Sequence, residues 1–76
     1  MPKLVTITPK KLVKILLYLG FVERDAEGSH VFFYHPDGRT TTVAIKSKEI
    51  GRGLLRKILN DINISKDAYE ILRNKL

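Results

Sequence analysis

Apolar residues recur at helical spacing near the start of the chain. Four of them stand at positions i, i+3, i+4 and i+7, on one side of a helix: Leu12, Ile15, Leu16 and Leu19. Thr8 followed by Pro9 is a typical helix start, because the hydroxyl can accept an early amide hydrogen and proline at the first position loses no needed donor. Gly20 can end the helix in the left-handed conformation. The pattern therefore predicts an amphipathic helix between Thr8 and Gly20.

Short runs of β-prone residues follow this helix. Residues 21–24 ("FVER") predict a first strand, and residues 25–28 ("DAEG") predict the turn after it. Residues 29–34 ("SHVFFY") predict a second strand and residues 40–46 ("TTTVAIK") a third. Between these two lies "HPDGR", residues 35–39, whose proline presets one turn angle and whose glycine supplies a positive φ. The second and third strands therefore form a hairpin.

The position of this turn determines how the two strands pair. If Pro36, Asp37 and Gly38 form the loop, His35 lies opposite Arg39, and the other pairs follow from there. These pairs are Tyr34–Thr40, Phe33–Thr41, Phe32–Thr42, Val31–Val43, His30–Ala44 and Ser29–Ile45.

The pairing assigns each side chain to one of two faces, because side chains alternate along a strand. The face expected to pack against the helices carries Val31, Phe33, Val43 and Ile45, with Ser29 and Thr41 at its margins. The other face carries His30, Phe32, Tyr34, Thr40, Thr42, Ala44 and Lys46. This second face is too polar for a core. We therefore expect His30 to point into solvent beside two aromatic rings.

Two more helices are predicted downstream. Residues 51–62 ("GRGLLRKILNDI") have an apolar side formed by Leu54, Leu55, Ile58, Leu59 and Ile62. Ser65 can cap a third helix over residues 66–76, which has an acidic residue in its first turn and basic residues in its last, in line with the helix dipole.

The order of elements is helix, three antiparallel strands, helix and a trailing helix, which is an α+β architecture. Two helices must cover one face of the sheet, because no other element can bury it, and the opposite face stays in water. A chain of 76 residues is long enough for one core. We expect a single domain over residues 1–76, with its core in about residues 8–62 and the C-terminal helix at about 65–75.

Composition narrows the classes of function. The chain has no cysteine, which excludes disulfides and thiolate metal sites, and two histidines with few clustered acids argue against structural zinc. We therefore expect no metal and no cofactor. The N-terminus lacks the pattern of a secretory signal, and no run approaches the roughly 18 apolar residues that a membrane helix needs. We expect a soluble, cytoplasmic protein without a membrane partner.

The net charge points to a polyanionic partner. Fourteen Lys and Arg against eight Asp and Glu give +6, which favours nucleic acid, although many small domains are basic for solubility alone. The excess is local, because six basic residues and only one acid, Glu49, lie between Arg39 and Lys57. Basic residues on the second helix are most often only its solvated side.

His30 is the residue best suited to acid–base chemistry. Histidine can take and give a proton near neutral pH, and RNA cleavage needs both steps: removal of a proton from the 2′-hydroxyl and protonation of the departing 5′ oxygen. The ordinary alternative is a surface histidine without a chemical role. Phe32 and Tyr34 could stack bases or form a patch that a partner covers. His35, beside the turn, should lean toward the other face.

These features together resemble one family. A first helix ending in Gly-Phe, then "GSH" with aromatics, "HPDGR", "TTTV" and "KEIGRGLLRKIL" are similar to the HicA family of toxins, also called YcfA-like proteins. The resemblance covers roughly Thr8 to Ser65. It implies a fold like that of a double-stranded-RNA-binding domain, α-β-β-β-α. It also implies ribosome-independent cleavage of mRNA and a HicB-type antitoxin that covers the active site.

The resemblance assigns roles to particular residues. The histidine of the family's Gly-Ser-His motif is catalytic and corresponds to His30. We expect the residues that contact RNA to be Gly28, Ser29, Phe32, Tyr34, Lys46, Lys48, Arg52 and Arg56. Many relatives have a proline and then a histidine after the third strand, where this chain has Ala44 and Lys46. A non-catalytic RNA-binding module, or a degenerate toxin, is therefore the alternative interpretation.

Overall fold

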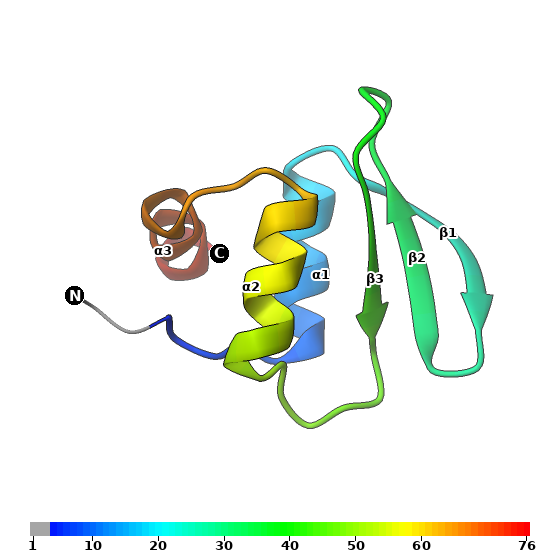
Figure 1. Ribbon diagram of the computed structural model, residues 1–76, viewed down its shortest axis with the longest axis horizontal. Coiled ribbons are helices and arrows are strands. Elements are labelled where there is room, and N and C mark those ends of the chain that lie inside the picture. Colours follow the sequence, from blue (N-terminus) through cyan, green and yellow to red (C-terminus); the bar gives the residue numbers. More distant parts are fainter. Residues whose placement is uncertain (1–3) are drawn as a thin grey trace.

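The computed structural model describes residues 4–76 of the chain. Its elements follow in the order α1 (Pro9–Tyr18), β1 (Val22–Glu27), β2 (His30–Tyr34), β3 (Thr40–Ala44), α2 (Arg52–Asp61) and α3 (Lys66–Lys75). The strands form an antiparallel sheet in the order β1-β2-β3. α1 and α2 cover one face of this sheet, and α3 lies on the far side of these two helices (Figure 1). The predicted α+β fold, with two helices on one face and an additional C-terminal helix, is confirmed.

α1 forms where the sequence predicts it. The Thr8 hydroxyl accepts a hydrogen bond from the Lys11 N–H at 3.2 Å, and Gly20 follows the helix with a φ of 96°. Three of the four predicted stripe residues are buried, and the fourth, Leu19, is half-buried against the core. A side chain at Gly20 would also crowd the hairpin, because its Cβ would lie 3.2 Å from Nε2 of His35.

β2 and β3 pair in the predicted register. The facing residues are His30 and Ala44, Val31 and Val43, Phe32 and Thr42, Phe33 and Thr41, and Tyr34 and Thr40. The His35 N–H donates to the Arg39 carbonyl oxygen at 2.8 Å, and Gly38 has a φ of 102°. One step beyond the strands, the Ile45 N–H donates to the Ser29 carbonyl oxygen at 2.9 Å. The loop chemistry therefore determines which side chains face the helices.

The first strand differs from its prediction. β1 extends to Glu27, so residues 25–27, predicted as a turn, belong to the strand, and the turn is Gly28–Ser29. The facing residues are Val22 and Tyr34, Glu23 and Phe33, Ala26 and Val31, and Glu27 and His30, with a bulge between Glu23 and Ala26. All six side chains of β1 are exposed, so no alternation of apolar and polar residues marks it in the sequence. Its extended form depends on backbone pairing with β2.

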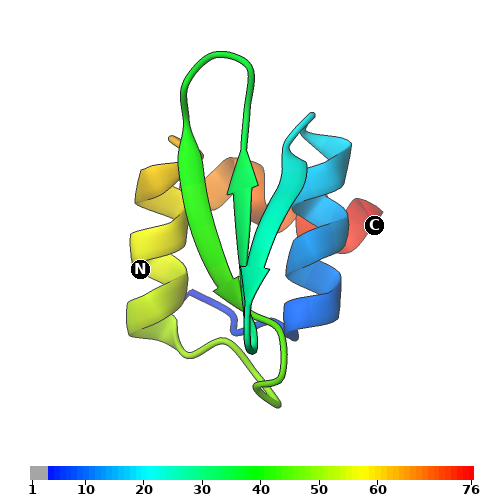
Figure 2. The same cartoon turned by 90° about the vertical axis from the view of Figure 1, so that its right-hand side faces the viewer.

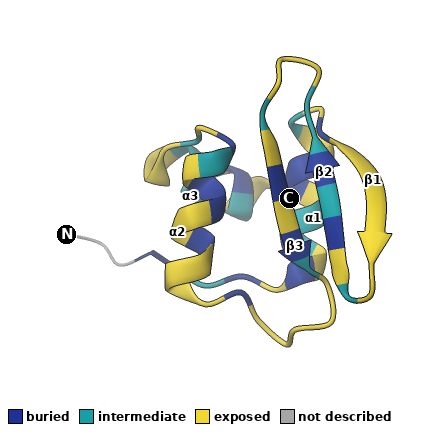
Figure 3. Cartoon of the chain, turned by 45° about the vertical axis from the view of Figure 1, so that its right-hand side comes forward, coloured by how far each residue is buried: buried dark blue, intermediate teal, exposed yellow. Residues whose placement is uncertain are grey.

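The core lies between the sheet and the two helices that cover it (Figure 3). The covered face contributes the buried side chains Val31, Phe33, Thr41 and Val43, the second helix contributes Leu55, Ile58 and Leu59, and buried Ile62 follows directly after that helix. Two residues predicted for the core are instead exposed. Ile45 is 43% exposed because β3 ends one residue before it, and Leu54 is 44% exposed because it stands outside the buried stripe of α2.

The segment before α1 also joins the core, which the sequence did not predict. Leu4 and Ile7 are buried, and Ile7 forms an isolated antiparallel bridge with Ile50. The Ile50 N–H donates to the Ile7 carbonyl oxygen at 2.7 Å. This bridge holds the segment just before α1 against the loop that precedes α2.

α3 packs through two buried side chains, Tyr69 and Leu72. Ser65 caps the helix as predicted, accepting a hydrogen bond from the Ala68 N–H at 3.1 Å. The Tyr69 side chain is fully buried, and its hydroxyl donates to the carbonyl oxygen of Val5 at 2.5 Å. Burial raises the pKa of the Tyr69 hydroxyl. α3 is thus part of the packed structure and lies away from the open face of the sheet (Figure 1).

Candidate active site on the open face of the sheet

A tight turn positions His30 at the start of β2. The turn consists of Gly28 and Ser29, and Gly28 takes a φ of 62°, a conformation that glycine adopts without steric cost. Because the turn has two residues, Glu27 and His30 flank it and face each other across β1 and β2. His30 is exposed, whereas its neighbour Val31 is buried against the helices. The alternation predicted from the hairpin register is therefore observed at His30.

A hollow of about 410 Å³ surrounds this histidine on the open face. Its lining residues come from all three strands: Asp25, Glu27, His30, Phe32 and Thr42. Phe32 is half-buried, and the other charged and polar members are exposed. The histidine therefore has an aromatic ring on its own strand and two carboxylates on the neighbouring strand.

Tyr34 lies further along the same face, next to a cation. The guanidinium carbon of Arg24 is 5.4 Å from the centre of the Tyr34 ring, within the range of a cation–π contact. Arg24 and Asp25 lie in the bulge between the two paired segments of β1. A bulge redirects side chains, and here it places both residues against the open face. Phe32 is left as the aromatic ring beside His30, and Tyr34 is partly engaged by Arg24.

Lys46 and Lys48 lie in the exposed segment that follows β3. β3 ends at Ala44, the partner of His30, so Lys46 comes two residues after that pair. The segment runs past the same end of the sheet as the turn between β1 and β2 (Figure 2). These two predicted cations therefore lie at the end of the open face where His30 stands.

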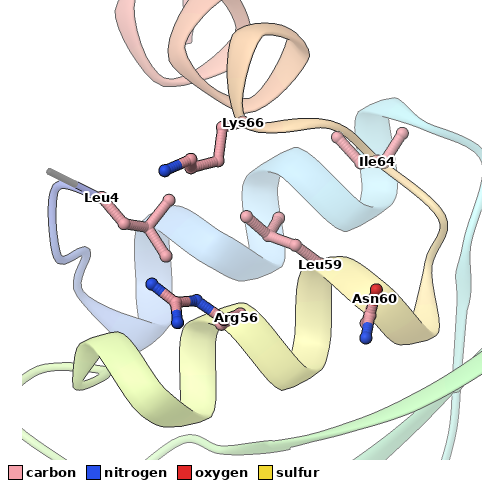
Figure 4. Close-up of a pocket in the computed structure, with 6 residues that line it drawn as sticks. All are labelled: Leu4, Arg56, Leu59, Asn60, Ile64 and Lys66. Carbon is pink, nitrogen blue, oxygen red and sulfur yellow. The ribbon is translucent and has the colours of Figure 1, made fainter. Parts of the chain in front are cut away.

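The two predicted arginines of α2, Arg52 and Arg56, have other surroundings than Lys46 and Lys48. Arg52 Nε donates to the Leu4 carbonyl oxygen at 3.1 Å. Arg56 lines a separate hollow of about 240 Å³ that Leu4, Leu59, Asn60, Ile64 and Lys66 complete. Figure 4 shows Arg56 and Lys66 reaching toward this hollow from α2 and from the start of α3. The structure does not bring Arg56 next to His30, and its contact with RNA stays a prediction that concerns another surface.

The second histidine supports the hairpin, as its predicted position suggests. The His35 ring meets the Phe21 ring edge-on, with 5.2 Å between ring centres, and its Nδ1 accepts the Asp37 N–H at 3.1 Å. Asp37 in turn accepts the backbone N–H of Arg39 at 3.1 Å and its Nε at 2.8 Å. The hydrogen bond from the Arg39 backbone, followed by the Arg39 charge, lowers the pKa of the Asp37 carboxyl. These contacts hold the turn that sets the register.

The family model described as "HicA toxin of bacterial toxin-antitoxin" matches residues 9–64, about three quarters of the chain. The chain belongs to the HicA toxin family. The resemblance predicted from the sequence is thereby confirmed, and the protein is a toxin of a toxin–antitoxin system. A search of curated proteins finds no match to the chain.

The part of the chain that matches the HicA family ends before α3 begins. The open face with His30 lies wholly within the match, whereas Tyr69 lies outside it. Across residues 4–76, no helix combines the length and the apolar composition needed to cross a bilayer. Within the same residues, no three His, Cys, Asp or Glu side chains are grouped so that they could hold a metal ion.

The sequence of this HicA protein does not identify four residues of the open face as candidate site residues. They are Arg24, Asp25, Glu27 and Thr42. Asp25 and Glu27 lie in residues 25–28, which the sequence predicts as a turn, whereas Arg24 ends the predicted first strand, for which the sequence predicts no register with β2. The signal was present in the dipeptide Gly28–Ser29, since a two-residue hairpin loop would have paired Glu27 with His30.

Proposed function

We propose that this HicA toxin is a metal-independent ribonuclease that cleaves mRNA in the cytoplasm, with His30 as a proton-transfer group. The observation that carries the proposal is the exposed position of His30 in a hollow of the open face, in a chain of the HicA family. A histidine there can reach a bound strand without rearrangement of the core. Phe32, in the same hollow, offers a half-buried ring on which a base can stack.

The reaction proceeds by internal attack. The 2′ oxygen loses its proton and attacks the adjacent phosphorus, the bond to the 5′ oxygen breaks, and that oxygen gains a proton. The products are a 2′,3′-cyclic phosphate and a free 5′-hydroxyl. Lys46 and Lys48 stabilise the charge on the phosphate from the segment after β3.

Growth and RNA integrity test this function directly. Induced expression of the protein arrests growth and fragments mRNA, and the His30→Ala variant does neither. Because His30 is exposed, the variant keeps its fold, which circular dichroism and a thermal melt can check. Purified protein cleaves ribosome-free RNA in the presence of EDTA. Equal arrest by two folded proteins, wild type and variant, would refute the role of His30.

A non-catalytic RNA-binding protein is the second candidate, favoured by Ala44 and Lys46, which depart from the proline and histidine that the family resemblance implies at these positions. Such a protein would contact phosphates and 2′-hydroxyls without breaking a bond. Labelled RNA separates the two candidates. Binding with a steep salt dependence and no new 5′-hydroxyl ends supports the second one.

We propose further that a HicB-type antitoxin neutralises the toxin by covering the open face. The described helices of the chain lie on the other side of the sheet, so Phe32 and the hollow are accessible to a partner (Figure 1). A neighbouring gene for a HicB-like protein, and suppression of cleavage by its product, are the expected results. An antitoxin that binds without inhibiting cleavage would contradict this proposal.

A further inference from the structure

We propose that Glu27 is the second proton-transfer group of the site, acting as general base while His30 acts as general acid. The inference rests on the proposed ribonuclease function. Its basis is the pairing of the two residues on either side of the Gly28–Ser29 turn. Residues that face each other in an antiparallel sheet have Cβ atoms about 4.5–5.5 Å apart. Both side chains line the same hollow on the open face.

The reaction needs two groups in one step. The proton of the 2′-hydroxyl passes to the Glu27 carboxylate as the 2′ oxygen bonds to phosphorus. The bond from phosphorus to the 5′ oxygen breaks, and that oxygen takes a proton from the His30 imidazolium. The attacking and leaving oxygens lie on opposite sides of the phosphorus, so the two groups must approach from different directions. Two adjacent side chains on two strands can approach from two directions, whereas a single histidine cannot.

The roles follow from the ordinary chemistry of the two residue types. Carboxylates are ionised at neutral pH and can accept a proton, whereas histidine changes its charge between pH 5 and 8 and can supply one. The ion pairs among residues 4–76 use the carboxylates of Asp37, Asp61 and Glu70. The Glu27 carboxylate is thus not engaged by a described cation.

Other charged groups surround the pair. Asp25 shares the hollow from β1, and Arg24 lies further along, over the Tyr34 ring. β3 contributes only uncharged side chains to this face, and the segment after it carries Lys46 and Lys48. A carboxylate repels a phosphate, and these lysines offset that repulsion at the same end of the sheet. The phosphate therefore lies on the β3 side of His30, and the 2′-hydroxyl on the β1 side, toward Glu27.

Asp25 supplies a matched control. Glu27→Gln and Asp25→Asn each remove one negative charge from the same hollow, and both residues are exposed, so both variants fold. We expect Glu27→Gln to lower the rate of RNA cleavage about 100-fold or more, in line with the loss of a general base. We expect Asp25→Asn, which removes the same charge without removing the residue that faces His30, to lose far less activity than Glu27→Gln. Equal losses in the two variants would show a charge effect only and overturn the proposal.

The pH profile of the cleavage rate and the effect of a changed leaving group identify which residue is the general base and which is the general acid. The wild-type rate rises with pH as a carboxylate ionises and falls as an imidazolium loses its proton, and Glu27→Gln loses the rise on the acid side. A substrate with sulfur in place of the 5′ oxygen needs no general acid. It restores cleavage by His30→Ala and leaves Glu27→Gln slow.

If Glu27→Gln keeps the wild-type rate while His30→Ala is inactive, this inference fails and the ribonuclease proposal stands. If wild type itself does not cleave RNA, the ribonuclease proposal fails.

Discussion

Phe32 and Phe33 are neighbours in β2 whose rings lie on opposite faces of the sheet. Phe33 is 0% exposed beneath the helices, whereas Phe32 is half-buried on the open face and lines the hollow around His30. One residue type in adjacent positions therefore contributes to the core in one case and to the candidate site in the other.

This relationship predicts that replacing phenylalanine by alanine has different effects at the two positions. Phe33→Ala leaves a cavity in the core and lowers the free energy of unfolding by about 3–5 kcal/mol. Phe32→Ala retains the fold but weakens binding of single-stranded RNA by about 1–3 kcal/mol, the usual contribution of one stacked base. Urea denaturation measures the first effect, and fluorescence anisotropy with labelled RNA measures the second. Equal RNA affinity of wild type and folded Phe32→Ala would remove Phe32 from the site.

The placement of the basic residues predicts which of them bind phosphate. Replacing Lys46 and Lys48 by glutamine reduces the slope of log affinity against log salt by about 0.7 for each lysine, the value for single strands. If RNA is confined to the open face, Arg56→Gln, which removes an equal charge from the hollow beside α3, leaves the slope unchanged. Binding measured from low to high salt gives each slope. A reduced slope in Arg56→Gln would show that RNA also contacts the α3 side.

The turn of the hairpin predicts a loss of stability in acid. The Arg39 backbone N–H and charge lower the pKa of Asp37 in the folded state, with His35 Nδ1 also 3.0 Å from its carboxylate. A depressed folded-state pKa gives stability that is present above the ordinary value of about 3.9 and is lost as pH falls through the lower value. Asp37→Asn should therefore lower the melting temperature at pH 7 and reduce its drop toward pH 3. Thermal melts of wild type and Asp37→Asn between pH 7 and pH 3 make the comparison, and equal drops in the two proteins would contradict this prediction.

The buried hydroxyl of Tyr69 predicts a loss of folding stability at alkaline pH. Its folded-state pKa is raised by burial, so stability falls as pH rises from about 10, the ordinary tyrosine value, through the raised value. Tyr69→Phe should not show this alkaline fall, because phenylalanine has no hydroxyl to ionise. At neutral pH it should cost about 1 kcal/mol, since the Val5 carbonyl oxygen loses its donor. Thermal melts from pH 7 to 11 compare the two proteins, with exposed Tyr18→Phe as the control.

Most of the hairpin could be predicted from the sequence because its determinants are local. The proline, aspartate and glycine of the turn set the pairing of Tyr34 with Thr40, and alternation then placed Phe33 inside and His30 outside. Helix α1 could also be predicted, because the sequence shows its Thr8 cap and its apolar stripe. The first strand was predicted only as far as Arg24, because an exposed edge strand has no burial pattern that marks its full length. Glu27 was missed for that reason.

The amino-acid sequence by itself determined the helix caps, the hairpin register and the exposure of His30, because each depends on hydrogen bonds and side-chain directions within a few residues. Only the tertiary structure decided that Glu27 faces His30, that Arg56 lies away from them, and that Tyr69 anchors α3. Those relationships depend on which surfaces meet when the elements pack. A contact between residues far apart in the chain leaves no periodic signal in the sequence around either one.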